Sequence, residues 1–155
     1  MHEALMQEAI RLSLEMMRRG RGGPFGAVIA RNGEVIGRGW NEVTTCQDPT
    51  AHAEIVAIRE ACRALNSPRL DGCEIYTSCE PCPMCLGAIY WARLSRLYFA
   101  ATRQDAAAAG FDDELIYGEI CLPCGERQLP TRQFLREQAL AALNEWRAKP
   151  DKIPY

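Results

Sequence analysis

The sequence predicts an α/β domain in which helices cover both faces of a mixed sheet. The chain opens with an amphipathic helix, whose apolar stripe is Leu5, Ala9, Leu12 and Met16. Two short apolar runs, 25–30 and 34–40, flank Asn32-Gly33, a dipeptide typical of a β-hairpin turn. Beyond residue 50, helical and strand patterns alternate, which places helices against the faces of the sheet.

The remaining elements are predicted from periodicity and turn residues. Residues 41–50 are polar and contain Asp48-Pro49, so they predict a loop. The predicted elements that follow are helix 51–65, strand 73–77, helix 82–93, strand 97–101 and helical turns over 105–110. Helix 82–93 is apolar almost all round, so we expect it to be buried. Residues 111–127 are irregular, 128–134 predict a last strand interrupted by Pro130, and a final helix precedes a proline-containing tail.

Length and composition predict one soluble domain spanning 1–155. A single hydrophobic core can serve 155 residues. No run of 18 apolar residues occurs, so we expect no membrane segment. The first residues lack the basic and apolar regions of a signal peptide, so we expect a cytoplasmic protein with reduced cysteines. The net charge of −2, without a basic stripe, argues against a nucleic-acid partner.

A split pattern of metal-binding residue types is the strongest chemical signal. His52-Ala53-Glu54 comes first, and Pro81-Cys82-Pro83-Met84-Cys85 follows. A hydrolytic zinc site uses three protein ligands, leaves one position for water, and needs a carboxylate to move protons. The pattern therefore predicts one catalytic zinc ion held by His52, Cys82 and Cys85, with Glu54 as the proton shuttle.

The spacing of these residues fits two helix starts. Cys82 and Cys85 would share one face of the first helical turn, where the helix dipole favours thiolates. His52 and Glu54, only two residues apart, would diverge in mid-helix, but both can reach one pocket from a first turn. The alternative is a structural zinc site in a non-catalytic module, with Cys79 as the fourth ligand. That alternative leaves Glu54 without a role.

These residues resemble the cytidine-deaminase superfamily and, more narrowly, the short bacterial guanine deaminases. The resemblance covers nearly the whole chain and rests on four stretches: Gly22 to Val28, Asp48 to Glu54, Thr77 to Ala92, and Asp105 to Asp113. It implies a three-layer α/β/α fold with a five-stranded mixed sheet. It also implies a hydrolase that converts guanine to xanthine and ammonia, in purine metabolism.

The resemblance further implies which residues bind the free purine base: Asn41, Phe25, Ala53, Trp91, Asp113 and Tyr155. Asn41 offers a donor and an acceptor to a purine edge. Asp113 would accept from guanine N–H groups, although Asp112 and Glu114 lie in the same acidic run. The resemblance places the C-terminal segment, about 128–155, over an active site of the other subunit in a swapped homodimer. The enzymes that this sequence resembles do not require a cysteine pair at Cys121 and Cys124, and we assign the pair no role.

Three other functions share parts of this pattern. A tRNA adenosine deaminase has the same zinc ligands but needs a basic surface for its polyanion. A deaminase of another free base, such as cytosine or the aminotriazine ammeline, uses the same chemistry. A non-catalytic zinc module would keep the metal without turnover.

Overall fold

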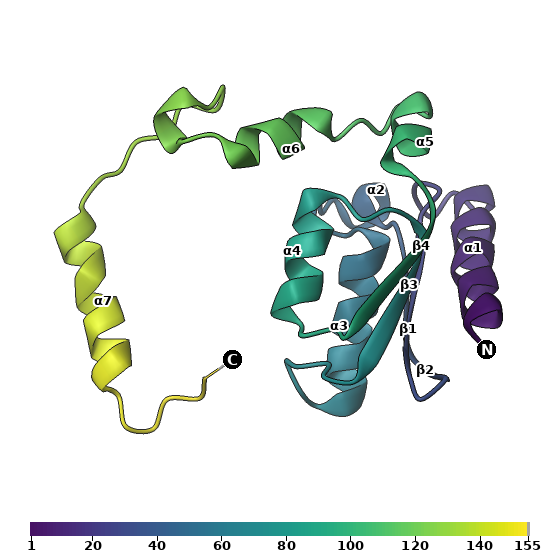
Figure 1. Cartoon of the computed structure of the whole chain (residues 1–155), viewed down its shortest axis with the longest axis horizontal. Coiled ribbons are helices and arrows are strands. Elements are labelled where there is room, and N and C mark those ends of the chain that lie inside the picture. Colours follow the sequence, from purple (N-terminus) through teal and green to yellow (C-terminus); the bar gives the residue numbers. More distant parts are fainter. Residues whose placement is uncertain (155) are drawn as a thin grey trace. The chain divides into compact units, whose positions relative to one another are not determined.

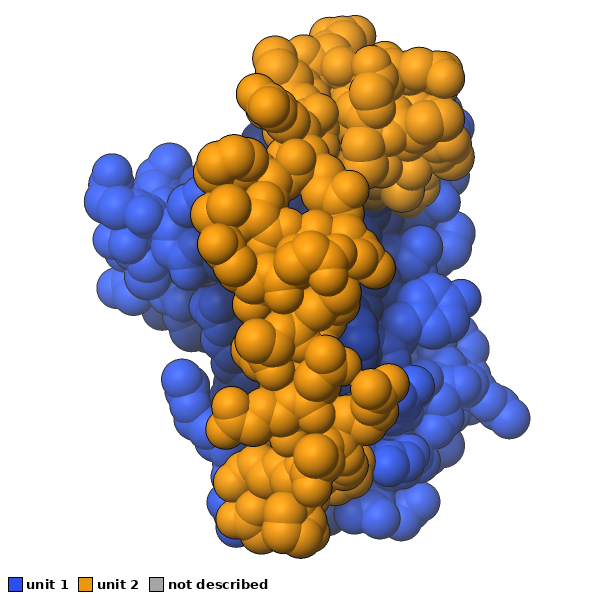
Figure 2. All heavy atoms as spheres, turned by 90° about the vertical axis from the view of Figure 1, so that its left-hand side faces the viewer, with its two compact units in different colours: residues 1–113 blue, residues 114–155 orange. Residues whose placement is uncertain are grey.

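The computed structural model describes residues 1–154 and divides the chain into two compact units, 1–113 and 114–155 (Figure 2). The elements of unit 1 are α1 (His2–Arg18), β1 (Gly26–Arg31), β2 (Glu34–Trp40), α2 (Val43–Cys46), α3 (Ala53–Leu65), β3 (Cys73–Cys79), α4 (Pro83–Trp91), β4 (Arg96–Ala101) and α5 (Arg103–Ala108). The elements of unit 2 are α6 (Glu114–Cys121), the short 3-10 helix η1 (Cys124–Glu126) and α7 (Arg136–Ala148).

A mixed sheet forms the middle layer of unit 1. Its strand order is β2-β1-β3-β4, with β1 antiparallel to both neighbours and β4 parallel to β3. The hairpin between β1 and β2 is confirmed, and Asn32 and Gly33 take φ angles of 53° and 84°. Two successive positive φ angles are what the tight turn of such a hairpin requires.

Helices cover both faces of this sheet (Figure 1). On one face α1 buries Leu5, Ala9 and Leu12 against Val28 and Ala30 of β1. On the other face α3 and α4 pack over a second cluster, made of Ala27, Ile29, Ala53, Ala57, Ala61, Leu70, Cys73, Ile75, Ile89 and Ala92. The predicted three-layer arrangement is therefore present in unit 1.

The five-stranded sheet predicted from the sequence is wrong for the described residues, which form four strands. Residues 128–134, expected to be the fifth strand, contain no strand. Pro130 lies in the middle of this segment and has no N–H to give to a sheet ladder. The sheet ends at β4, on the strand that follows α4.

Helix α4 differs from its prediction in burial. Its buried residues are Cys85 and Ile89, whereas Met84, Tyr90 and Trp91 are exposed within the chain. One face of α4 packs on the sheet, and the opposite face is apolar without a covering layer in unit 1. The expectation of a fully buried helix is wrong because an even apolar composition does not reveal how many sides of a helix are covered.

Three short helices occur where the sequence predicted none. The predicted loop 41–50 contains α2, and the irregular stretch 111–127 contains α6 and η1. The helix α2 is a single turn, too short for a periodic pattern to appear. The apolar residues Leu115, Ile116 and Ile120 of α6 are all exposed within the chain.

Unit 2 has no buried residue in either of its α-helices. The exposed apolar side chains of this unit include Leu129, Phe134, Leu135, Leu143, Trp146 and Ile153. The boundary between the units, after Asp113, lies earlier than the predicted exchanged segment, which begins near residue 128. None of the helices formed by residues 1–154 is both long and apolar enough to cross a membrane.

The backbone of β2 lies directly against the backbone of α3. A Cβ atom at Gly39 would lie 2.0 Å from the carbonyl oxygen of Ala53, and one at Gly37 would lie 2.6 Å from that of Ala57. Neither oxygen can move without displacing the helix. The two glycines therefore set the distance between β2 and the first turns of α3.

Replacing Gly39 with Ala is expected to lower the free energy of unfolding by about 1–3 kcal/mol, because the added methyl group must push α3 away from the sheet. Urea unfolding followed by circular dichroism measures this change. Gly118→Ala is the matched control, since Gly118 lies within α6 and a Cβ atom added there would meet no atom within 4 Å. Equal stability of Gly39→Ala and the wild type would contradict this account of the β2–α3 contact.

Candidate metal centre and active site

The first turns of α3 and α4 supply the predicted metal ligands. His52 is the N-cap residue of α3, and Cys82 is the N-cap residue of α4. Both have extended backbone angles, so each loop ends on the residue that begins its helix. Pro83 occupies the first helical position after Cys82, where its missing N–H costs no helix hydrogen bond.

The three predicted ligands are brought together. Their donor atoms all lie within 4.8 Å of one another, and residues 1–154 contain no other such group of three or more His, Cys, Asp or Glu side chains. The His52 Nδ1 atom lies 3.5 Å from Cys82 Sγ and 3.6 Å from Cys85 Sγ. A tetrahedral zinc ion with ordinary Zn–N and Zn–S bonds requires N···S separations of about 3.6 Å. The donor set therefore fits zinc, with Nδ1 as the histidine ligand.

The charges in this cluster favour a metal ion. A hydrogen bond from the Cys85 thiol, together with His52, lowers the pKa of Cys82 to about 4. The Cys82 thiolate in turn holds the proton on Cys85 and raises the pKa of that thiol. The hydrogen bond between His52 and the Cys82 thiolate raises the pKa of His52. Each donor thus competes for protons that a divalent cation would displace.

Glu54 lies in the first turn of α3 and is 8% exposed. Burial raises the pKa of this carboxyl above its usual value, and the nearby Cys82 thiolate adds to the shift. A carboxyl with a raised pKa binds its proton more tightly than an exposed one, and this property suits general acid–base catalysis. The structure therefore places the buried Glu54 carboxyl close to the metal ligands.

Asn41 follows β2 and is also 8% exposed. Its Oδ1 atom accepts hydrogen bonds from the backbone N–H groups of Gly23, at 3.2 Å, and Val43, at 3.3 Å. A Cβ at Gly22 would lie 1.8 Å from the Asn41 carbonyl oxygen, so this loop closes on Asn41 only with glycine there. The side-chain oxygen is used within the protein, which leaves the Nδ2 group as the part of the amide that can donate to a ligand.

An aromatic pair stands next to Asn41. The Asn41 N–H donates to the Phe25 carbonyl at 3.1 Å. The Phe25 ring meets the Phe111 ring edge to face, with 4.8 Å between centroids. Phe25 was predicted as a pocket residue from the family resemblance, whereas Phe111 was noted only as part of a family stretch. A lone aromatic residue after a glycine carries no spacing signal, so contact with Phe25 is what draws attention to Phe111.

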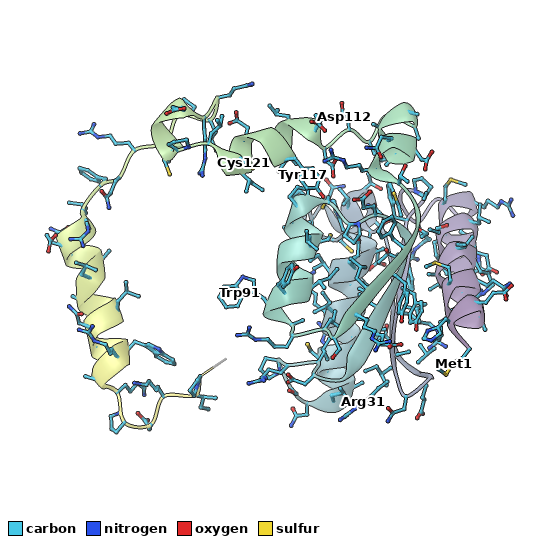
Figure 3. The ribbon with its side chains drawn as sticks, viewed as in Figure 1. Met1, Arg31, Trp91, Asp112, Tyr117 and Cys121 are labelled. Carbon is cyan, nitrogen blue, oxygen red and sulfur yellow. The ribbon has the colours of Figure 1, made fainter. Side chains whose placement is uncertain are left out.

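The other predicted substrate residues divide into two groups. The first group, Ala53 and Asp113, lies near the metal ligands. Ala53 is buried between His52 and Glu54, and Asp113 interacts electrostatically with the Cys82 thiolate. Burial, followed by that thiolate, raises the pKa of Asp113, so this carboxyl lies near the metal ligands. Trp91, in contrast, is the last residue of α4, 65% exposed and directed away from the sheet (Figure 3). Tyr155 lies outside the described residues.

The remaining cysteines are all free thiols. Cys79 donates to the Thr102 carbonyl at 3.5 Å and is not a member of the donor group. A closed four-ligand site with Cys79 as fourth ligand therefore does not form. Cys121 and Cys124 are exposed within the chain at the end of α6 and in η1.

Comparisons with known proteins agree with this geometry. Residues 1–101 match the family model described as the cytidine and deoxycytidylate deaminase zinc-binding region. The chain is 51% identical to guanine deaminase of Bacillus subtilis over 154 residues, which covers 99% of each protein. An X-ray structure of guanine deaminase from Bacillus subtilis aligns with a TM-score of 0.97 at 51% identity, covering 100% of this chain and 99% of that one.

A tRNA-specific adenosine deaminase of Agrobacterium fabrum is 50% identical, with 76% of this chain and 83% of that protein covered. The family model spans well over half of the sequence and includes all three metal donors. The chain belongs to the cytidine and deoxycytidylate deaminase family and carries its zinc-binding region.

Proposed function

We propose that this protein is a guanine deaminase, which removes the 2-amino group of guanine by hydrolysis and releases xanthine and ammonia in purine metabolism. The observation that carries the proposal is the 51% identity to the Bacillus subtilis guanine deaminase over 99% of both proteins. That similarity includes unit 2. The adenosine deaminase match covers a smaller share of the chain, 76%.

The metal ligands and Glu54 support a hydrolytic mechanism. A zinc ion bound by His52, Cys82 and Cys85 would lower the pKa of a coordinated water and so supply a nucleophile at neutral pH. Glu54 is the buried carboxyl beside these ligands, positioned to accept a proton from water. The same carboxyl would pass this proton to the ring nitrogen next to C2, and would then take the proton of the hydroxyl group added at C2 and give it to the departing amine, so that C–N cleavage leaves a carbonyl and restores the carboxylate.

The residues around this centre support recognition of a purine. The Asn41 Nδ2 group donates to an acceptor on the base edge, because its Oδ1 atom is already bonded to Gly23 and Val43. Asp113 accepts from N–H groups of the base. The Phe25 ring, held edge to face by Phe111, would form an apolar wall for a flat ligand, and the buried Ala53 lies between His52 and Glu54.

We also propose a homodimer in which the C-terminal segment is exchanged between subunits. Unit 2 cannot stabilise itself, because neither of its α-helices buries a residue and its apolar side chains are exposed. Such a segment needs a surface outside its own unit. In the exchanged arrangement Tyr155 and Trp91 would complete the substrate pocket, which accounts for the exposure of Trp91 within a single chain.

The rival substrates predict different surfaces and products. A tRNA substrate requires neutralisation of many phosphates, whereas this chain has a net charge of −2. Cytosine and aminotriazines such as ammeline need the same zinc chemistry, but a pocket that is smaller or that presents different hydrogen-bonding groups to the base. The amine that is removed therefore has to be measured.

The deciding experiment is ammonia release from the zinc-loaded protein with guanine, cytosine, ammeline, guanosine and a tRNA anticodon stem-loop. We expect saturable release from guanine that exceeds release from every other compound by at least tenfold in kcat/KM. Release from the stem-loop adenosine without release from guanine would replace the proposal with tRNA editing. Zinc binding without turnover of any compound would favour the non-catalytic module.

Replacing Glu54 with Gln is expected to lower kcat by about 10²- to 10⁴-fold, because the amide cannot take up the water proton. Zinc content and thermal stability should stay at wild-type values, since Glu54 is not one of the three ligands. Steady-state kinetics measures kcat, metal analysis measures the zinc content, and thermal unfolding measures the stability, all on one preparation. Full activity of Glu54→Gln would show that another group transfers the proton.

Deleting the last few residues through Tyr155 is expected to lower kcat/KM for guanine without changing the zinc content of unit 1. The reason is that the proposed arm contributes to substrate binding and not to the metal donors, which all lie between residues 52 and 85. Kinetics and metal analysis of the shortened chain test this. Wild-type kinetics after the deletion would remove the arm from the active site.

A further inference from the structure

A tight turn directly precedes His52 in the sequence and determines where this ligand lies. The Ala51 N–H donates to the Asp48 carbonyl at 3.0 Å, and the His52 N–H donates to the Thr50 carbonyl at 2.8 Å. The far end of the turn is attached to α2, because the Asp48 N–H donates to the Val43 carbonyl at 3.1 Å. The position of the histidine ligand is therefore set by the residues of the turn before it.

The Asp48 side chain holds this turn closed. Its Oδ1 atom accepts from the Thr50 N–H at 2.8 Å and from the Thr50 hydroxyl at 2.7 Å. A carboxylate that accepts from the backbone two residues later fixes the chain in a defined turn. These two bonds, the hydroxyl first, keep the pKa of Asp48 below its usual value. The group is consequently ionised at neutral pH.

Arg59 fastens the turn to α3. Its Nη1 atom lies 3.5 Å from Asp48 Oδ2, and its Nη2 atom donates to the Thr50 hydroxyl oxygen at 3.4 Å. Arg59 is about two helical turns beyond His52, on the helix that carries Glu54. The turn is thus joined to α3 at two places, its N-cap residue and Arg59. Both charged side chains are partly exposed, so the ion pair alone is weak and the bonds to Thr50 carry most of the restraint.

We propose that Asp48 is a positioning residue for the metal centre: by closing the turn onto Thr50 and Arg59, it holds His52 where its Nδ1 atom meets Cys82 and Cys85. Groups that orient a metal ligand affect how long the metal stays bound, besides affecting catalysis. The inference rests on the zinc site and not on the identity of the substrate. It can therefore fail or hold independently of guanine deamination.

The test is the rate of zinc release from the purified protein to an excess of a chromophoric chelator. Asp48→Ala is expected to release zinc about 10- to 100-fold faster than the wild type, because His52 is no longer held in place. Asp48→Asn keeps an oxygen acceptor for both Thr50 bonds. Its rate of zinc release should stay within about threefold of the wild-type rate, because the geometry of the turn, and not the charge, positions His52. Circular dichroism confirms that the fold is unchanged.

Asp71 provides a matched control. It accepts from Arg69 at 2.9 and 3.0 Å, is exposed, and lies in the loop after α3 without contacting the ligands. Asp71→Ala should leave zinc release at the wild-type rate. Zinc release from Asp48→Ala at the wild-type rate, or equal acceleration by Asp71→Ala, would overturn the proposal.

A second variant covers the case in which Asp48→Ala does not fold. Thr50→Val removes the hydroxyl that donates to Asp48 and accepts from Arg59, while the backbone bond to Asp48 is retained. We expect zinc release several times faster than in the wild type. An unchanged rate in folded Thr50→Val would overturn the proposal in the same way.

Discussion

The meeting of two helix N-termini is the constraint on which the rest of unit 1 depends. His52 and Cys82 are the N-cap residues of α3 and α4, and their donor atoms lie 3.5 Å apart. Two positive helix ends and an adjacent imidazole make this point electropositive, so it stabilises the Cys82 thiolate before any metal binds. The sheet below must hold both helices at the right separation, which explains the glycine contacts between β2 and α3.

Burial gives Glu54 its chemistry, and the same burial has a cost for stability. An ionised carboxylate with 8% exposure and a thiolate nearby is unfavourable, which is why its pKa is raised. A group with this property is retained where its proton is used. Cys85 shows the complementary case, since its proton is held by Cys82 until a cation replaces it. The site is therefore destabilised without metal and is relieved when zinc neutralises the thiolates.

The local elements of unit 1 could be predicted because each has a strong local cause. Short-range chemistry determines the Asn32-Gly33 turn, the stripe of α1 and the helix starts near His52 and Cys82. The exposed face of α4 could not be predicted, since apolar composition does not tell whether a sheet or a second body covers it. The missing fifth strand has a similar cause. Whether residues 128–134 pair with a sheet edge depends on tertiary contacts, and Pro130 removes one of the bonds that pairing needs.

In the site, the metal ligands could be predicted from the sequence more fully than the residues that contact the substrate. The three metal ligands could be predicted from sequence because they are a pattern of residue types at fixed spacing, and their donor atoms do come together. The environment of Asn41 could not be predicted in this way, because residue spacing does not reveal that the Gly23 and Val43 N–H groups occupy its side-chain oxygen.

The metal donors lie in unit 1, whereas unit 2 carries exposed apolar residues. Unit 1 holds every metal donor and its own two-sided core, so the reaction centre can form without residues 114–155. Unit 2 has an apolar surface but no buried residue in its α-helices, so it gains stability only by packing on another surface. The proposed exchange of unit 2 between subunits would supply such a surface, while every metal donor stays within unit 1.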